Sequence, residues 1–170
     1  MRIDSQKTFI ASIKEKIRLA QYEALKEVNT QLIKLYWEIG KDISEKQEES
    51  WGESIVSVLS KELQTEFYEI SGFSERNLWL MTQFYNEYQK IEFLQPLVAE
   101  ISWTKHITIM SKCKDNQERR FYIMATKNFG WSKNVLIHQF VKKDQYSLKA
   151  NINYPKKLML MGVRNKNDKI

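Results

Sequence analysis

The acidic residues are the first groups to test for chemistry, because paired carboxylates can hold a metal ion that acts on a phosphate ester. Many metal-dependent nucleases hold Mg²⁺ with paired carboxylates and keep a lysine two positions after one of them, in a D…(D/E)-x-K arrangement. The chain has 21 Asp and Glu residues, and none of them has a lysine two positions later. The sequence therefore predicts no catalytic residue, no metal site and no cofactor, and we do not expect the chain to be an enzyme.

The histidines and the cysteine offer no second kind of reactive site. His106 and His138 lie 32 residues apart, and neither has another His or Cys at metal-binding spacing. The single cysteine, Cys113, excludes an internal disulfide and is expected to be a small buried residue. The two G-x-S strings, at Gly72 and Gly130, precede helical patterns and follow no strand, so they are not nucleophile elbows.

Two stretches share a pattern that begins a helix, ISGFSERNLWLMTQFYNEY (70–88) and GWSKNVLIHQFVKK (130–143). In each, a glycine is followed by an aromatic residue and by a serine that is a good N-cap. The aromatic residue and a leucine five positions later have the spacing of a hydrophobic staple. A helix, a sharp turn and a capped second helix make a helix-turn-helix unit. Two well-capped helices in an ordinary helical domain are the alternative.

The polar faces of these two helices are the candidate contacts with nucleic acid. Arg can form paired hydrogen bonds with guanine, and Asn or Gln with adenine, which favours Arg76, Asn77 and Gln83 as base-reading residues. The residues assigned to phosphates or to the second polar face are Lys105, Lys133, Asn134, His138, Gln139, Lys142 and Lys143. The pattern leaves open which helix enters the groove, and either face could simply be solvated.

Charge is distributed unevenly along the chain. Residues 1–100 contain 12 Lys or Arg and 17 Asp or Glu, whereas residues 101–170 contain 15 and 4. A basic half beside an acidic half indicates a polyanionic partner, most simply nucleic acid. A basic tail that only keeps the protein in solution is the alternative.

Residues 5–48 are expected to form one very long helix, or two that join near Val28 and Asn29. Apolar residues recur there in steps of three or four, at Ile10, Ile13, Ile17, Ala20, Ala24, Val28, Leu32, Leu35, Ile39 and Ile43. About 40 helical residues would span roughly 60 Å, which exceeds one small core. Such a helix packs against several others or pairs with another chain. Tyr36, Trp37 and Gly40 mark the expected docking point for the helices that follow.

The rest of the chain is expected to be helical as well, with helices near 53–67, 75–88, 103–113, 116–129 and 131–143. Pro96 lies in a connection over residues 89–100, the expected hinge. The inward-facing set is Ile55, Val58, Leu59, Leu63, Phe67, Leu78, Met81, Phe84, Tyr85, Tyr88, Trp103, Ile107, Met110, Phe121, Met124, Ala125, Phe129, Val135, Leu136 and Phe140. Ser102 and Asp115 or Asn116 are the expected caps of the third and fourth of these helices.

The predicted fold is therefore all-α, a long N-terminal helix followed by a helical bundle with two helix-turn-helix-like units. Three parts are expected: a dimerisation arm over residues 1–48, a helix-turn-helix-like domain over 49–145 and a basic tail over 146–170. No apolar run approaches the length of a membrane span and no signal peptide follows Met1. The sequence thus predicts a cytoplasmic protein without a membrane partner.

Several blocks of the sequence resemble one bacterial family. These blocks are LYWEIGKDISEKQ (35–47), WGESIVSVLSKELQTEF (51–67), GFSERNLWLMTQFYNEY (72–88), LQPLVAEISWTKH (94–106) and GWSKNVLIHQ (130–139). They resemble the N-terminal domain of YhcG-type proteins of the PD-(D/E)XK nuclease superfamily, a family also filed as a domain of unknown function. The resemblance implies an all-helical, helix-turn-helix-like and DNA-binding region that precedes a separate C-terminal nuclease domain. This chain stops where that domain should begin, so we expect an isolated N-terminal module.

Two functions are consistent with these observations. The first is a DNA-binding module that positions DNA for a nuclease domain or partner absent from this chain. The alternative is a homodimerisation or protein-interaction module that docks a nuclease subunit, with the long first helix as the dimer contact. The two functions are compatible, because helix-turn-helix proteins often bind DNA as dimers.

Overall fold

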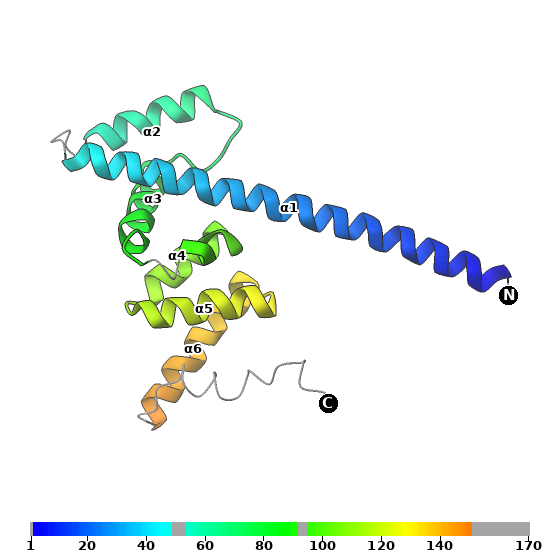
Figure 1. Cartoon of the computed structure of the whole chain (residues 1–170). Coiled ribbons are helices and arrows are strands. Elements are labelled where there is room, and N and C mark those ends of the chain that lie inside the picture. The colour runs from blue at the N-terminus through cyan, green and yellow to red at the C-terminus, as the bar shows by residue number, and fades with distance from the viewer. Residues whose placement is uncertain (1, 49–53, 92–94, 151–170) are drawn as a thin grey trace. The chain divides into compact units, whose positions relative to one another are not determined.

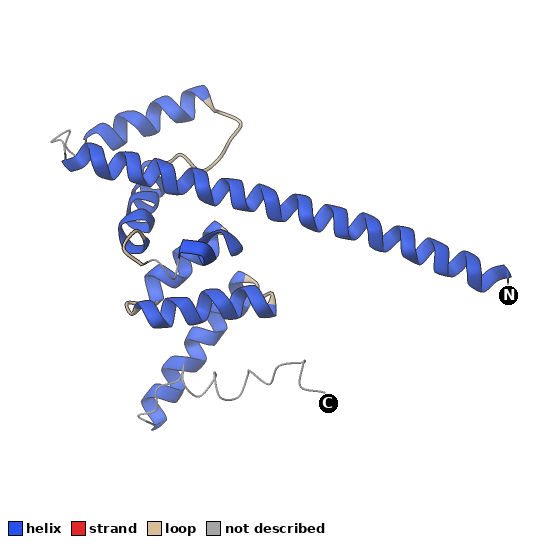
Figure 2. Cartoon of the chain, viewed as in Figure 1, coloured by secondary structure: helices blue, strands red, loops and turns tan. Residues whose placement is uncertain are grey.

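The computed structural model describes residues 2–48, 54–91 and 95–150. Those residues form six α-helices and one short 3-10 helix, and they contain no strand (Figure 2). The predicted all-α class is confirmed. The chain divides into two compact units, Met1–Gln95 and Pro96–Ile170. The division falls within the connection over residues 89–100, and the long helix shares a unit with the two helices that follow it.

Helix α1 (Arg2–Glu48) is continuous over 47 residues, with no break at Val28 or Asn29. Its C-terminal third packs against α3 (Glu75–Tyr88) and buries Ile33, Tyr36 and Ile43. Residues 6–28 of α1 are exposed throughout. Figure 1 shows this N-terminal half extending past α2 and α3 within the first unit. The helix therefore continues well beyond the core that it helps to form.

Gly40 sets how closely α1 and α3 approach. A Cβ atom added at Gly40 would lie 2.6 Å from the carbonyl carbon of Met81, a distance that real Cβ atoms do not show. Beside this contact the ring of Trp37 packs edge-on against Phe84 and Tyr85, with centroid distances of 5.6 and 5.2 Å. The predicted docking point on the first helix is confirmed.

Helix α2 (Ser54–Glu66) packs on α3, and the turn between them is held by hydrogen bonds from α2. The Ser60 hydroxyl donates to the Phe73 carbonyl at 2.9 Å, and the Gln64 amide donates to Ser60 Oγ at 2.7 Å. Ser74 caps α3, its hydroxyl accepting from the Asn77 backbone N–H. The caps and periodicity thus place α3 where the sequence predicts it.

The described residues from Pro96 onward form η1 (Gln95–Glu100, which begins at the last residue of the first unit), α4 (Trp103–Lys112), α5 (Asn116–Phe129) and α6 (Lys133–Ala150). Helix α4 packs on both α5 and α6. Asp115 caps α5 by accepting from the Glu118 N–H at 2.8 Å. Ser102 occupies the N-cap position of α4, but its side chain makes no capping hydrogen bond. α6 extends beyond its predicted end near residue 143.

Several residues predicted to face inward do not. Val58, Phe67, Met124, Phe129 and Val135 are exposed, while Tyr122, Ile123 and Leu136 are fully buried. The inward face of α5 is centred on Tyr122 and Thr126, so Met124 points the other way; Val135 precedes the buried Leu136 by one residue, about 100° around the helix. The half-buried members of the predicted set are Ile55, Leu59, Leu63, Tyr85 and Ile107. The remaining members of the predicted inward set are buried.

Of the predicted basic tail over residues 146–170, residues 146–150 belong to α6, and the part from residue 151 lies outside the described residues. Among the helices that are described, none is both long and apolar enough to cross a membrane.

Candidate nucleic-acid interface

The start of α6 is determined by a glycine turn and a serine cap, and its orientation by two buried side chains. Gly130 ends α5 in the left-handed conformation, with φ of 63°, which a glycine adopts without strain. Ser132 then accepts a hydrogen bond from the Val135 N–H at 3.3 Å, as the predicted cap. Leu136 and Phe140 are buried, and the ring centroids of Phe140 and Tyr122 lie 4.2 Å apart. These anchors fix which face of α6 is turned to solvent.

The exposed face of α6 carries Asn134, His138 and Lys142, which recur at four-residue steps and so lie on one stripe. Lys133 is exposed in the first turn, whereas Gln139 is half-buried at the edge. Within the described part of the chain no hydrogen bond or ion pair engages the side chains of this stripe. The side chain of Lys143 lies outside the described residues. The structure thus brings five of the predicted residues together on one helix.

The polar face of α3 differs, because its predicted base-reading residues are largely engaged within the chain. The Asn77 side-chain amide donates to the Gly72 carbonyl, and the Gln83 amide donates to the Glu87 carboxylate. Arg76 is exposed, but α3 also carries Glu75 and Glu87, so its charges sum to −1. This face is a weaker match to a polyanion than that of α6.

Some of the basic side chains of the second unit are buried or paired and so are not available to a ligand. Residues 101–150 contain ten Lys or Arg and three Asp or Glu. Arg119 is buried, and its Nε donates to the Cys113 carbonyl at 3.0 Å. Lys127 pairs with Glu100 at 2.9 Å. Lys105 is half-buried, and burial lowers the pKa of its ammonium group. Apart from the lysines of α6, exposed basic side chains of this unit include Lys112 and Lys114.

Two aromatic side chains next to α6 were missed by the predictions. The rings of Phe129 and Trp131 stack with centroids 5.8 Å apart, and Phe129 is 57% exposed. Both flank Gly130, whose left-handed turn ends α5 and separates them from its buried face. The signal in the sequence was the glycine itself, because a helix that ends there leaves its last side chain without the cover of a following turn.

His106 and Cys113 occupy the core of the second unit and are fully buried. The His106 Nε2 donates to the Val98 carbonyl at 2.6 Å. Burial lowers the pKa of His106 to about 4, although the hydrogen bond to Val98 opposes the shift. Among the described residues, no group of three or more His, Cys, Asp or Glu is placed to hold a metal ion.

Comparison with known proteins assigns the chain to a family. Residues 12–147 match the family model of the DUF1016 N-terminal domain, and this range is most of the chain and extends over parts of both units. No curated protein and no solved structure matches it. The resemblance noted from the sequence blocks is thereby confirmed.

Proposed function

This chain belongs to the DUF1016 N-terminal domain family, and we propose that it binds DNA through the exposed face of α6. Bound DNA would be positioned for a separate nuclease domain or subunit. Lys133 and Lys142 contact phosphates, while Asn134 and His138 reach base edges. The observation that carries the proposal is the stripe of Asn134, His138 and Lys142, which is exposed, free of intramolecular partners among the described residues and set in a strongly basic segment.

The division of roles follows from the chemistry of the side chains. An Asn amide can donate to and accept from adenine in the major groove, whereas lysines contribute sequence-independent contacts to phosphates. The exposed Val135, Ile137 and Val141 flank the stripe and can contact thymine methyl groups or sugars. α3 supports the proposal less well, because Asn77 and Gln83 already donate to groups of the chain itself.

The test is fluorescence anisotropy of labelled duplex DNA across a salt series, with the full chain and a Lys133→Ala/Lys142→Ala variant. Each phosphate contact contributes about 0.9 to the slope of log K against log salt, so the variant should lose about 2 units of slope. At 0.1 M salt the affinity should fall on the order of 50-fold. The matched control is Lys61→Ala/Lys90→Ala, which removes the same charge from exposed positions of the first unit.

Three outcomes would contradict the proposal. Absence of binding at low salt would exclude DNA as the ligand of the basic segment. Equal losses in the two double variants would show that net charge, and not α6, determines affinity. A larger loss in Arg76→Ala/Gln83→Ala than in the α6 variant would move the interface to α3.

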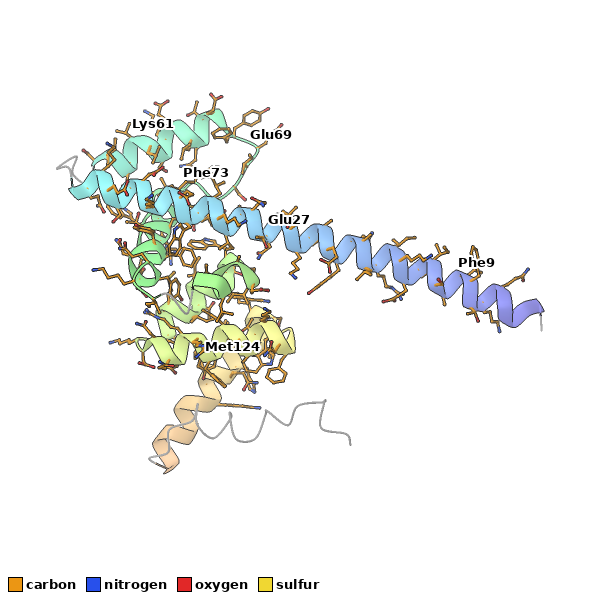
Figure 3. All side chains as sticks on the ribbon, in the orientation of Figure 1. Phe9, Glu27, Lys61, Glu69, Phe73 and Met124 are labelled. Atoms are coloured by element: carbon orange, nitrogen blue, oxygen red, sulfur yellow. The ribbon has the colours of Figure 1, made fainter. Side chains whose placement is uncertain are left out.

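The stacked Phe129 and Trp131 rings predict a preference for unpaired bases at the start of α6. Stacking of a base on an exposed aromatic ring contributes about 1–3 kcal/mol, so Phe129→Ala should weaken single-stranded DNA binding about tenfold or more. Duplex affinity should change little, because paired bases cannot reach the ring. Met124→Ala is the control, since it truncates another exposed apolar side chain of α5 (labelled in Figure 3). Equal binding of single strands by Phe129→Ala and wild type would remove the aromatic pair from the interface.

A further inference from the structure

Helix α1 has two apolar faces, and the first unit covers only one of them. The face packed on α3 is formed by Ile33, Tyr36, Gly40 and Ile43. The second face, here called the outer seam, consists of Ile10, Ile13, Ile17, Ala20, Ala24, Val28, Leu32 and Leu35. At 100° per residue, most of the outer seam lies on the side of α1 opposite the packed face. All eight of its residues are exposed.

The outer seam is long, regular and unpartnered. Its steps of three and four residues keep it on one side of the helix for roughly 38 Å. Ile17 is 53% exposed and Val28 is 66% exposed. Soluble monomers seldom expose contiguous apolar surface of this extent, and helices in water take most of their stability from packing of such a face. The N-terminal half of α1 therefore has an apolar face that no described residue of the first unit covers.

We propose that the partner is the outer seam of a second copy of this chain, paired antiparallel. Charge complementarity selects this occupant and this direction. Residues 6–18 contain four Lys or Arg and one Glu, whereas residues 27–39 contain one Lys and two Glu. A parallel pair in register would place the basic segment beside its own copy. An antiparallel pair centred near Tyr22 and Glu23 places it beside the net acidic segment.

The same register matches the apolar residues of the two copies. Pairing of positions whose numbers sum to about 45 brings Ile17 opposite Val28, Ile13 opposite Leu32 and Ile10 opposite Leu35. The small Ala20 and Ala24 of both copies meet at the centre, where they permit a close approach of the two backbones. Lys16 comes beside Glu27 of the second copy (Glu27 is labelled in Figure 3). Each contact occurs twice around a two-fold axis, so the pairing closes as a dimer.

The first experiment is sedimentation of the full chain at micromolar to 100 μM concentration. We expect a dimer whose dissociation constant rises at least 100-fold in Ile17→Asp, because a carboxylate would be buried in the seam. Leu19→Asp is the matched control: Leu19 is 58% exposed and lies on the opposite side of α1 from Ile17, so its dimer should be unchanged. Circular dichroism verifies that both variants keep the helix content of the wild type.

Disulfide cross-linking tests the direction of the pair, in a chain whose buried Cys113 is replaced by serine. A mixture of Ile17→Cys and Val28→Cys chains should form the mixed disulfide on mild oxidation. Ile17→Cys alone should not, because its two copies would lie about 16 Å apart along the axis, beyond the reach of a disulfide. A strict monomer at 100 μM, or a dimer equally stable in Ile17→Asp, would overturn the outer-seam contact. Ready self-cross-linking of Ile17→Cys would overturn the antiparallel direction.

Discussion

Replacement of Gly40 by alanine should destabilise the first unit by about 3 kcal/mol, near the upper end of the usual cost of overpacking a core. Alanine is the better helix former by about 1 kcal/mol, so helix propensity alone predicts the opposite sign. The added methyl group would enter the space of the Met81 carbonyl, on the backbone of α3. A backbone cannot change rotamer to make room, so α1 and α3 must move apart and the packing of Trp37 on Phe84 and Tyr85 is lost with them.

Urea denaturation combined with hydrogen exchange measures this effect and locates it. Amides of α3 should lose protection in Gly40→Ala, while amides of α5 should keep theirs. Gly130→Ala is the comparison, because its Cβ meets no atom within 4 Å and only the left-handed backbone, with φ of 63°, opposes it. That backbone strain should destabilise the second unit, which contains Gly130, by about 1–2 kcal/mol. A Gly40→Ala protein as stable as the wild type would show that the two helices are not held at this distance.

Acidification should destabilise the second unit through His106. Burial lowers the pKa of this histidine to about 4 from an ordinary value of 6.5, so the folded protein holds it neutral. Between those two values the unfolded chain binds a proton that the folded chain does not bind, and stability must fall as the pH falls. The full loss from this group, reached below pH 4, is about 3 kcal/mol. Well above pH 7 the group is neutral in both states and contributes no pH dependence.

The measurement is a comparison of unfolding free energies at pH 7 and pH 4 for wild type and His106→Gln. A glutamine amide can still donate to the Val98 carbonyl, as His106 Nε2 does, but it cannot take up a proton. The variant should therefore lack the part of the acid destabilisation that His106 causes. NMR titration gives the pKa directly, and because the chain has two histidines, His138→Gln assigns the signals. Titration of His106 near pH 6.5 would contradict the prediction.

The sequence alone determined the features that depend on neighbours within a few residues. The predicted caps Ser74 and Ser132, and Asp115 of the two candidates for α5, each accept from an N–H three residues later. The helical state of residues 5–48 followed from the absence of proline and from apolar residues at helical steps, whereas the structure decided that they form one helix with no break near Val28 and Asn29. The all-α class and the family assignment rest on the same local information.

Only the tertiary structure decided how these helices are used. α1 carries two apolar faces at the same periodicity, and its packing on α3 through Gly40 leaves the outer seam exposed. On α3 the side-chain amide of Asn77 donates a hydrogen bond to the Gly72 carbonyl, whereas Asn134 on α6 is exposed to solvent. Phe129 satisfies the apolar spacing of α5 but is its last residue and stays exposed beside Trp131. Periodicity identifies an apolar or a polar face, but what covers that face depends on segments distant in the chain, whose contacts local spacing does not encode.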